Sequence, residues 1–189
     1  TTAINLFTLL TGEDTGGTWT QTSGTGGTFN AAAGTYTPAV GATSSTFNYM
    51  VGGGTCPVDN EVVTINISPQ ANAGTGGAAT DCAGTNNSID LFSLVTGEQT
   101  GGAWTRVSGT GGPFTAGTGT YVSTSTATTS VFRYTVTGIA PCVNSTADVT
   151  VNITGAPTAG TGSAVSRCDN STTAINLFTL LTGEDTGGT

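Results

Sequence analysis

The feature that most constrains the fold of this chain is an internal repeat. Residues 1–18 recur without a change at residues 172–189, which defines one long period. A diverged copy lies between them: Trp104 matches Trp19 at an offset of 85, and after one inserted residue Cys142 matches Cys56 at an offset of 86. Two units of about 85–86 residues, each the size of a small domain, therefore make up the long period. A regular repeat of this kind is typical of arrays whose units fold locally and contact their neighbours.

The repeat also defines the expected domain boundaries. A complete unit spans residues 69–154, residues 1–68 form a unit that lacks its first strand, and residues 155–189 begin the next unit. We expect the chain to be a window from a longer continuous array. The alternative is a short subunit whose tail completes the head of the next subunit by strand donation. We favour the window, because residues 172–189 would compete with the identical residues 1–18 for one position.

Alternation of apolar and polar residues predicts β-strands in each unit. Residues 45–51 place Phe47, Tyr49 and Val51 on one face, and the same pattern recurs at residues 130–136. The Thr-rich opposite faces suit strands, because β-branched side chains fit a pleated surface. Further strands are expected at residues 17–21, 61–67, 102–107 and 148–153.

Short strands joined by Gly-rich turns predict an all-β fold. In tandem repeats of about 85–86 residues, we expect two sheets packed as an immunoglobulin-like β-sandwich, with aromatic and aliphatic side chains between them. The Gly-rich runs at residues 25–27 and 109–112 are predicted turns. Residues 4–10 are ambiguous, because their apolar positions fit a short helical turn as well as a strand.

The composition excludes several classes of function. The chain has 3 Lys+Arg against 11 Asp+Glu, a formal net charge of −8 and no His. Nucleic acids and anionic membrane surfaces need clustered basic residues, so neither is an expected partner. No apolar run approaches the roughly 20 residues of a membrane-spanning helix, so we expect no membrane insertion. Without His or Lys the common general bases are absent, and we expect no catalytic residue and no cofactor.

Three residue groups have a functional and a structural interpretation. The adjacent carboxylates Glu13 and Asp14 suggest acid–base chemistry, but a solvated turn is the favoured interpretation. Trp19 and Trp104 suggest a carbohydrate-stacking platform, but each lies in a strand pattern as a core tryptophan does. Six acidic residues offer oxygen ligands for calcium, but no dense acidic loop occurs, and we predict no metal site. These six are Asp59, Glu61, Asp81, Asp90, Asp148 and Asp169.

The cysteines are the candidate site residues. Two occur per unit at matching places, and successive cysteines lie much too far apart in sequence for the close Cys-x-x-Cys pairs of a Cys-only zinc site. Disulfides are therefore expected, and with them an oxidising compartment. We favour a Cys82–Cys142 pair, with Cys56 and Cys168 bonded to residues outside the chain. The alternative pairs Cys56 with Cys82 and Cys142 with Cys168.

The motifs of the complete unit resemble a known family. Residues 72–105 contain NAGTGG and DCAGTNNSIDLFSLVTGEQTGGAWT, and residues 130–153 read SVFRYTVTGIAPCVNSTADVTVNI. These motifs, each with its cysteine, resemble the immunoglobulin-like repeats of giant secreted surface proteins in Bacteroidetes, including gliding-motility adhesins. The resemblance covers the whole chain. It implies an extracellular or cell-surface array exported by the type IX secretion system, and it transfers no catalytic residue.

We therefore expect a structural protein that is not an enzyme. Its repeats would form an extended, disulfide-stabilised stalk or extracellular filament, and neighbouring repeats or copies would associate with one another. Pro69 and Pro157 would restrict the linkers at residues 68–73 and 155–158. Strands of about ten residues would give each unit a length of roughly 35–45 Å. The alternative function is an array of modules that bind carbohydrates or other surface polymers, with surface glycans as partners.

Overall fold

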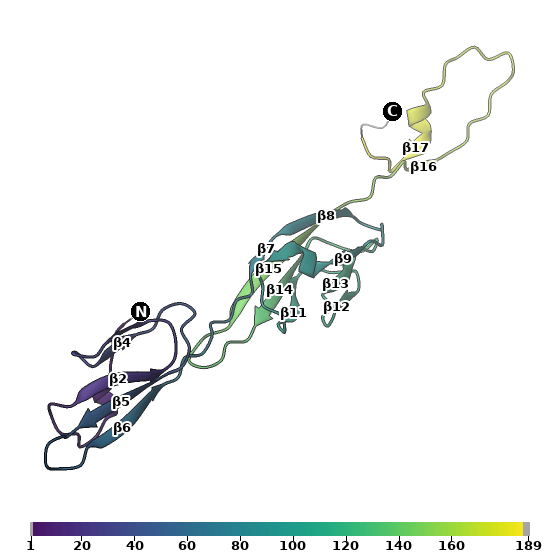
Figure 1. Cartoon of the computed structure of the whole chain (residues 1–189). Helices are drawn as coiled ribbons and strands as arrows, with labels where there is room; N and C mark the ends of the chain where they lie inside the picture. Colours follow the sequence, from purple (N-terminus) through teal and green to yellow (C-terminus); the bar gives the residue numbers. More distant parts are fainter. Residues whose placement is uncertain (1, 187–189) are drawn as a thin grey trace. The chain divides into compact units, whose positions relative to one another are not determined.

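The computed structural model describes residues 2–186 and shows an all-β chain (Figure 1). Contacts within the chain define two compact units. Unit 1 contains residues 1–72 and 136–145, and unit 2 contains residues 73–135 and 146–189. The boundaries expected from the repeat, with a complete unit at residues 69–154, stay a prediction.

Unit 1 contains two antiparallel sheets of three strands each in the described residues. The first sheet has the strand order β2 (Thr18–Ser23), β5 (Ser45–Val51), β6 (Asp59–Ile65). The second has the order β1 (Ile4–Asn5), β4 (Thr35–Thr37), β3 (Thr28–Asn30). Strand β6 therefore lies at an edge, paired with β5 on one side.

Unit 2 repeats this arrangement and adds three strands within residues 73–154. Its larger sheet has the order β11 (Ala103–Ser108), β14 (Ser130–Val136), β15 (Ser145–Thr154), β8 (Ala78–Cys82). The smaller sheets are β12 (Phe114–Thr115), β13 (Thr120–Val122), β9 (Ser88–Asp90), and the pair β10 (Val95–Thr96), β7 (Thr75–Gly76). Strands β7, β8 and β10 have no counterpart strand in the part of unit 1 that the structure describes. Strand β8 runs parallel to β15, so it covers the edge that β6 leaves open in unit 1.

The ambiguous segment at residues 4–10 contains both predicted structures. The two-residue strand β1 is followed by the 3₁₀ helix η1 (Leu6–Leu9), and η2 (Leu91–Leu94) repeats it in unit 2. The side-chain oxygen of Asn5 accepts the N–H of Phe7 at 3.1 Å, which satisfies a free donor at the helix start. Leu6 and Leu91 are completely buried, so each short helix anchors its unit to the core.

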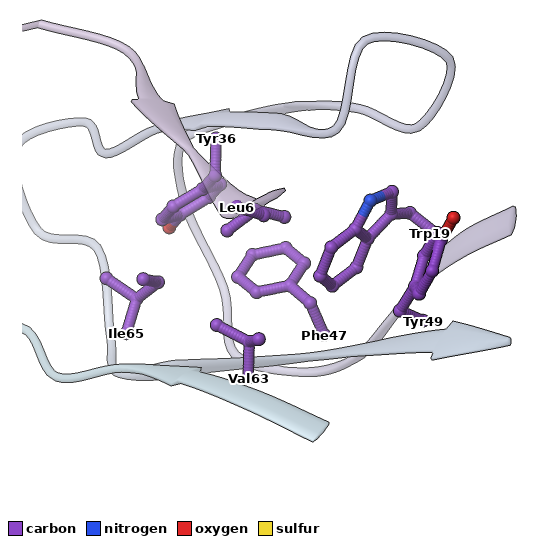
Figure 2. Close-up of a cluster of buried hydrophobic side chains, with 7 residues drawn as sticks. All are labelled: Leu6, Trp19, Tyr36, Phe47, Tyr49, Val63 and Ile65. Carbon is purple, nitrogen blue, oxygen red and sulfur yellow. The ribbon is translucent and has the colours of Figure 1, made fainter. Parts of the chain in front are cut away.

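The core of unit 1 lies between its two sheets and is rich in aromatic side chains (Figure 2). Tyr36 of β4 packs on Phe47 of β5 with ring centroids 5.0 Å apart, and Trp19 of β2 packs on Tyr49 at 4.9 Å. Such aromatic pairs contribute about 0.5–1.5 kcal/mol each beyond their burial. The matching pairs in unit 2 lie at 4.9 and 5.2 Å, so the repeat of sequence is also a repeat of packing.

The strands predicted from alternation are confirmed. Strands β5 and β14 have the predicted bounds, and the ends of β2, β6, β11 and β15 differ from prediction by three residues or fewer. The Gly-rich runs at residues 25–27 and 109–112 lie between strands, as predicted.

Residues 155–186 repeat elements found near the start of unit 2, and the prediction that they begin another unit stays a prediction. Strand β16 (Thr161–Gly162) pairs with β17 (Leu181–Thr182), as β7 pairs with β10, and the 3₁₀ helix η3 (Leu177–Leu180) lies between them. Leu177 is 71% exposed, whereas Leu91 at the same place in unit 2 is completely buried. Among the described residues, no helix has the length and apolar character needed to cross a membrane.

Candidate functional site

Unit 1 carries a groove of about 580 Å³ beside the exposed start of β6. The turn after η1 lines it with Leu10, Thr11 and Glu13, and the segment around the start of β6 lines it with Cys56 and Asp59. The floor includes Tyr49 and Val51 at the end of β5. Most of these residues have a direct counterpart in unit 2, so the two units can be compared position by position.

In unit 2 the matching position is filled by the chain itself. A Cβ atom built on Gly74 would lie 2.5 Å from the carbonyl oxygen of Thr96 and 2.8 Å from the nitrogen of Glu98. Thr96 and Glu98 are the counterparts of Thr11 and Glu13 in the repeat. The groove of unit 1 is therefore the position that residues 73–77 occupy in unit 2.

Strand β8 continues along the edge next to this position. It pairs in parallel with β15, from Thr150 opposite Ala78 to Thr154 opposite Cys82. The counterparts of these β15 residues in unit 1 are residues 64–68, of which Thr64 and Ile65 are the last two residues of β6 and the others follow it. Val62 on this strand is 56% exposed. An open strand edge presents unpaired N–H and C=O groups and can template the addition of another strand.

The cysteines lie at the ends of these strands, and the structure has all four as free thiols. The thiol of Cys142 donates to the carbonyl oxygen of Ser68 at 3.4 Å. The sulfur of Cys82 accepts a hydrogen bond from the hydroxyl of Thr154, also at 3.4 Å. Cys142 precedes β15 by three residues and Cys82 is opposite its last residue, so the length of β15 lies between them along the strand. The pairing of Cys82 with Cys142, and the alternative pairing, stay predictions.

The adjacent carboxylates belong to a structural turn. The hydroxyl of Tyr49 donates to the main-chain carbonyl of Asp14 at 2.9 Å and accepts the N–H of Gly17 at 3.0 Å. Tyr134 makes the same two bonds in unit 2, at 2.8 and 2.9 Å. Each tyrosine thus closes the turn by main-chain contacts. The side chains of Glu13 and Asp14 are exposed to solvent.

The two tryptophans are core residues, as the strand pattern predicts. Trp19 and Trp104 are each 3% exposed. Phe7 meets Trp19 edge to face with ring centroids 5.6 Å apart, and Phe92 covers Trp104 in the same way at 5.5 Å. Neither indole ring presents a free face on which a sugar ring can stack.

Several of the acidic residues already have donors within the protein. The carboxylate of Asp81 accepts hydrogen bonds from Ser123, Thr85, Asn87 and the N–H of Cys82. These bonds, that from Ser123 foremost, hold the pKa of Asp81 below its usual value of 3.8.

Asp148 is a second acidic residue with donors in the protein: it forms a bidentate ion pair with Arg133. Both N–O distances are 2.7 Å. The hydrogen bonds from Arg133 lower the pKa of Asp148, and the carboxylate raises the pKa of Arg133. In the described part of the chain, no three residues of the types His, Cys, Asp and Glu gather closely enough to hold a metal ion.

One notable polar residue was not singled out from the sequence. The guanidinium of Arg106 lies over the rings of Tyr121 and Phe132, 5.1 and 5.2 Å from their centroids, and donates to the carbonyls of Gly111 and Gly112. Gln21 occupies the matching position in unit 1 and donates to the carbonyls of two residues in its own turn. The sequence signal that could have identified this contact is the polar residue at the same strand position in both units.

These features define an all-β protein in which one set of strands and aromatic contacts is repeated. No protein-family profile matches the chain, and no curated protein matches it. Among solved structures, the chain is similar to an endo-fucoidan hydrolase of glycoside hydrolase family 107, at 16% identity and a TM-score of 0.24. A variant of the same hydrolase matches at 18% identity and the same TM-score. Each match covers 74% of this chain and spans 24% of the hydrolase. A likeness of this size carries no argument about function.

Proposed function

We propose that this chain is a structural repeat segment of a secreted or cell-surface fibre or adhesin. Its units are immunoglobulin-like β-sandwiches, joined in series into an extended stalk or filament that disulfides stabilise. The observation that carries the proposal is the residue-by-residue repetition of the core. The aromatic pairs and the tyrosine-closed turns recur in both units at nearly the same distances. Repetition of one folding unit is how structural arrays gain length.

The chemistry of the chain supports a passive role. A chain of 189 residues without His has few groups able to act as general bases, and its acidic side chains at Asp81 and Asp148 are held by structural hydrogen bonds. The carbohydrate-binding alternative loses its two best aromatic candidates, because both tryptophans are buried. We therefore propose no enzymatic activity.

The test is to locate the native protein. Antibodies raised against the purified chain, used for immunogold electron microscopy of the cells that produce it, are expected to label extracellular fibres or the outer cell surface. Absorbing the antibodies with purified chain is the control and should remove the label. Gold particles confined to the cell interior would contradict the proposal.

A further inference from the structure

We infer that a disulfide joins each long period to the next, between Cys82 and Cys56 of the following period. The inference deepens the proposed structural role and rests on it, since it needs long periods joined in series. Residues 172–189 repeat residues 1–18, so in such an array the cysteine-containing loop that comes next after that of Cys142 is the loop of Cys56. This pair differs from the Cys82–Cys142 pair favoured from the sequence.

The first observation is the distance between the two cysteines at the ends of β15. Cys82 is opposite Thr154, the last residue of this strand, and Cys142 precedes its first residue, Ser145, by three. Strand β15 has ten residues, which span about 30 Å. The Cα atoms of a disulfide lie within about 7 Å of each other. Cys82 and Cys142 of one folded sheet are therefore too far apart to be joined to each other.

The second observation is that Cys82 lies beside the residue at which β15 ends. The hydroxyl of Thr154 donates to the sulfur of Cys82 at 3.4 Å and to the carbonyl oxygen of Asp81 at 3.3 Å. The N–H of Ala83 donates to the carbonyl oxygen of Thr154 at 2.8 Å. Cys82 is exposed, so its thiol is accessible where the linker at residues 155–158 begins.

The third observation is that the counterpart of Thr154, Ser68, contacts a different cysteine. The thiol of Cys142 donates to the carbonyl oxygen of Ser68 at 3.4 Å. The hydroxyl of Ser68 donates to the carbonyl oxygen of Ala140 at 3.1 Å. The loop between β14 and β15 therefore lies against the residue at which the linker at residues 68–73 begins.

The two contacts are made by one position of the repeat. Thr154 has beside it the cysteine of its own strand β8, and Ser68 has beside it the cysteine of a loop that comes later in the chain. In an array of equivalent units, both contacts are made at every such position. The loop cysteine that reaches Thr154 is then Cys56 of the following period, the counterpart of Cys142, and it meets Cys82 there.

The loop that carries Cys56 folds back as the loop of Cys142 does. A Cβ atom on Gly52 would lie 3.0 Å from the carbonyl oxygen of Pro57. A Cβ atom on Gly138 would lie 2.3 Å from the carbonyl oxygen of Val143, the counterpart of Pro57. Each loop thus returns at the residue after its cysteine. Cys56 is exposed, so its thiol is free to react.

Oxidation of this pair needs an external disulfide, such as oxidised glutathione. The thiolate of one cysteine attacks it, forms a mixed disulfide and releases one reduced glutathione. The thiolate of the other cysteine then displaces the second glutathione and completes the protein disulfide. Two electrons and the two thiol protons pass to the two molecules of reduced glutathione. Each junction gains a second covalent connection beside the linker at residues 155–158, which restricts rotation about that linker and suits a stiff stalk.

The test uses two long periods in tandem, residues 1–171 followed by residues 1–189 in one chain. Three variants each keep two cysteines and carry serine at the other cysteine positions. The test variant keeps Cys82 of the first period and Cys56 of the second. One control keeps Cys82 and Cys142 of the first period, and the other keeps Cys56 and Cys82 of the first period. After equilibration in a glutathione redox buffer and quenching with N-ethylmaleimide, mass spectrometry of the monomeric fraction counts the free thiols.

We expect at least about tenfold more intramolecular disulfide in the test variant than in either control, because the folded junction holds its two thiols at a high effective concentration. In concentrated urea the order should reverse, because both controls close shorter loops of the unfolded chain. Equal oxidation of the three variants in buffer, or more disulfide in either control than in the test variant, would overturn the inference.

The result is separable from the test of the proposed function. Immunogold label on extracellular fibres, together with no excess of disulfide in the test variant, would refute this inference and leave the structural role standing. The expected disulfide in a protein that labels only the cell interior would refute the structural role instead.

Discussion

At the scale of single residues, Gly34 shows how tightly the aromatic core is packed. Its φ of +61° suits glycine, and an added Cβ would lie 2.5 Å from Cε2 of Phe7 and 2.9 Å from Nε1 of Trp19. Gly12 has a φ of +76°, but a Cβ there meets no atom within 4 Å. Backbone strain alone costs about 1 kcal/mol, and overpacking adds about 1–3 kcal/mol.

We therefore expect Gly34→Ala to destabilise unit 1 by about 2–4 kcal/mol and Gly12→Ala by about 1 kcal/mol. Urea unfolding followed by tryptophan fluorescence measures both. Using Trp104→Phe as the background restricts the signal to Trp19 and hence to unit 1. Equal losses for the two variants would show that the contact with Phe7 and Trp19 contributes nothing.

Arg106 is the second residue-scale case. Its charge lies over the rings of Tyr121 and Phe132, and its guanidinium donates to two turn carbonyls. Arg106→Gln, which copies Gln21 of the other unit, is expected to destabilise unit 2 by about 1–2 kcal/mol. Urea unfolding in a Trp19→Phe background reports this unit alone. Arg167→Gln, at an exposed position, is the control and should leave the midpoint unchanged.

At the scale of elements, Asp81 joins β8 to the turn after it and to Ser123 after β13. Its pKa is lowered from 3.8, so its bonds stabilise the folded state fully above that value. This contribution is lost as pH falls through the lower pKa of the folded state. We expect Asp81→Asn to lower the melting temperature at pH 7 more than at pH 2, measured by circular dichroism. Asp169→Asn, at an exposed position, is the control. An equal effect of Asp81→Asn at both pH values would contradict the role of its charge.

The elements also show what sequence can and cannot predict. Alternation identified β5 and β14 with their bounds, because a strand with one buried face has a strict period of two. The offset between the copies predicts that residues 1–68 lack a first strand, and this stays a prediction. Neither signal states which strand lies next to which. The parallel pairing of β8 with β15, and so the groove beside β6, depends on tertiary contacts that periodicity does not encode.

The candidate site was predictable to a similar degree. The matching places of the four cysteines led to the prediction of disulfides, since cysteine spacing is visible in any repeat, and one of the four, Cys56, lines the groove. Their partners were not predictable, because a pairing depends on which strand ends meet in space. Asp81 and Arg133 were not predicted to be structural, since their partners Ser123 and Asp148 are distant along the chain and meet them only in the folded sheets.

At the scale of the whole molecule, the repeat of sequence is also a repeat of strand pairing. Residues 172–189 are identical to residues 1–18, and their Leu181 and Thr182 pair with β16 as β10 pairs with β7. Under the proposed function, units that repeat in this way give every copy of the chain the same contact surfaces.

Copies of the chain are therefore expected to associate into oligomers as the protein concentration rises. The exposed edge strand β6, on which Val62 is 56% exposed, is one surface that can take part, because an open strand edge presents unpaired main-chain groups. Size-exclusion chromatography with light scattering measures the mass distribution, and negative-stain electron microscopy shows whether the oligomers are linear. A chain that stays monomeric at every concentration would contradict the proposed self-association.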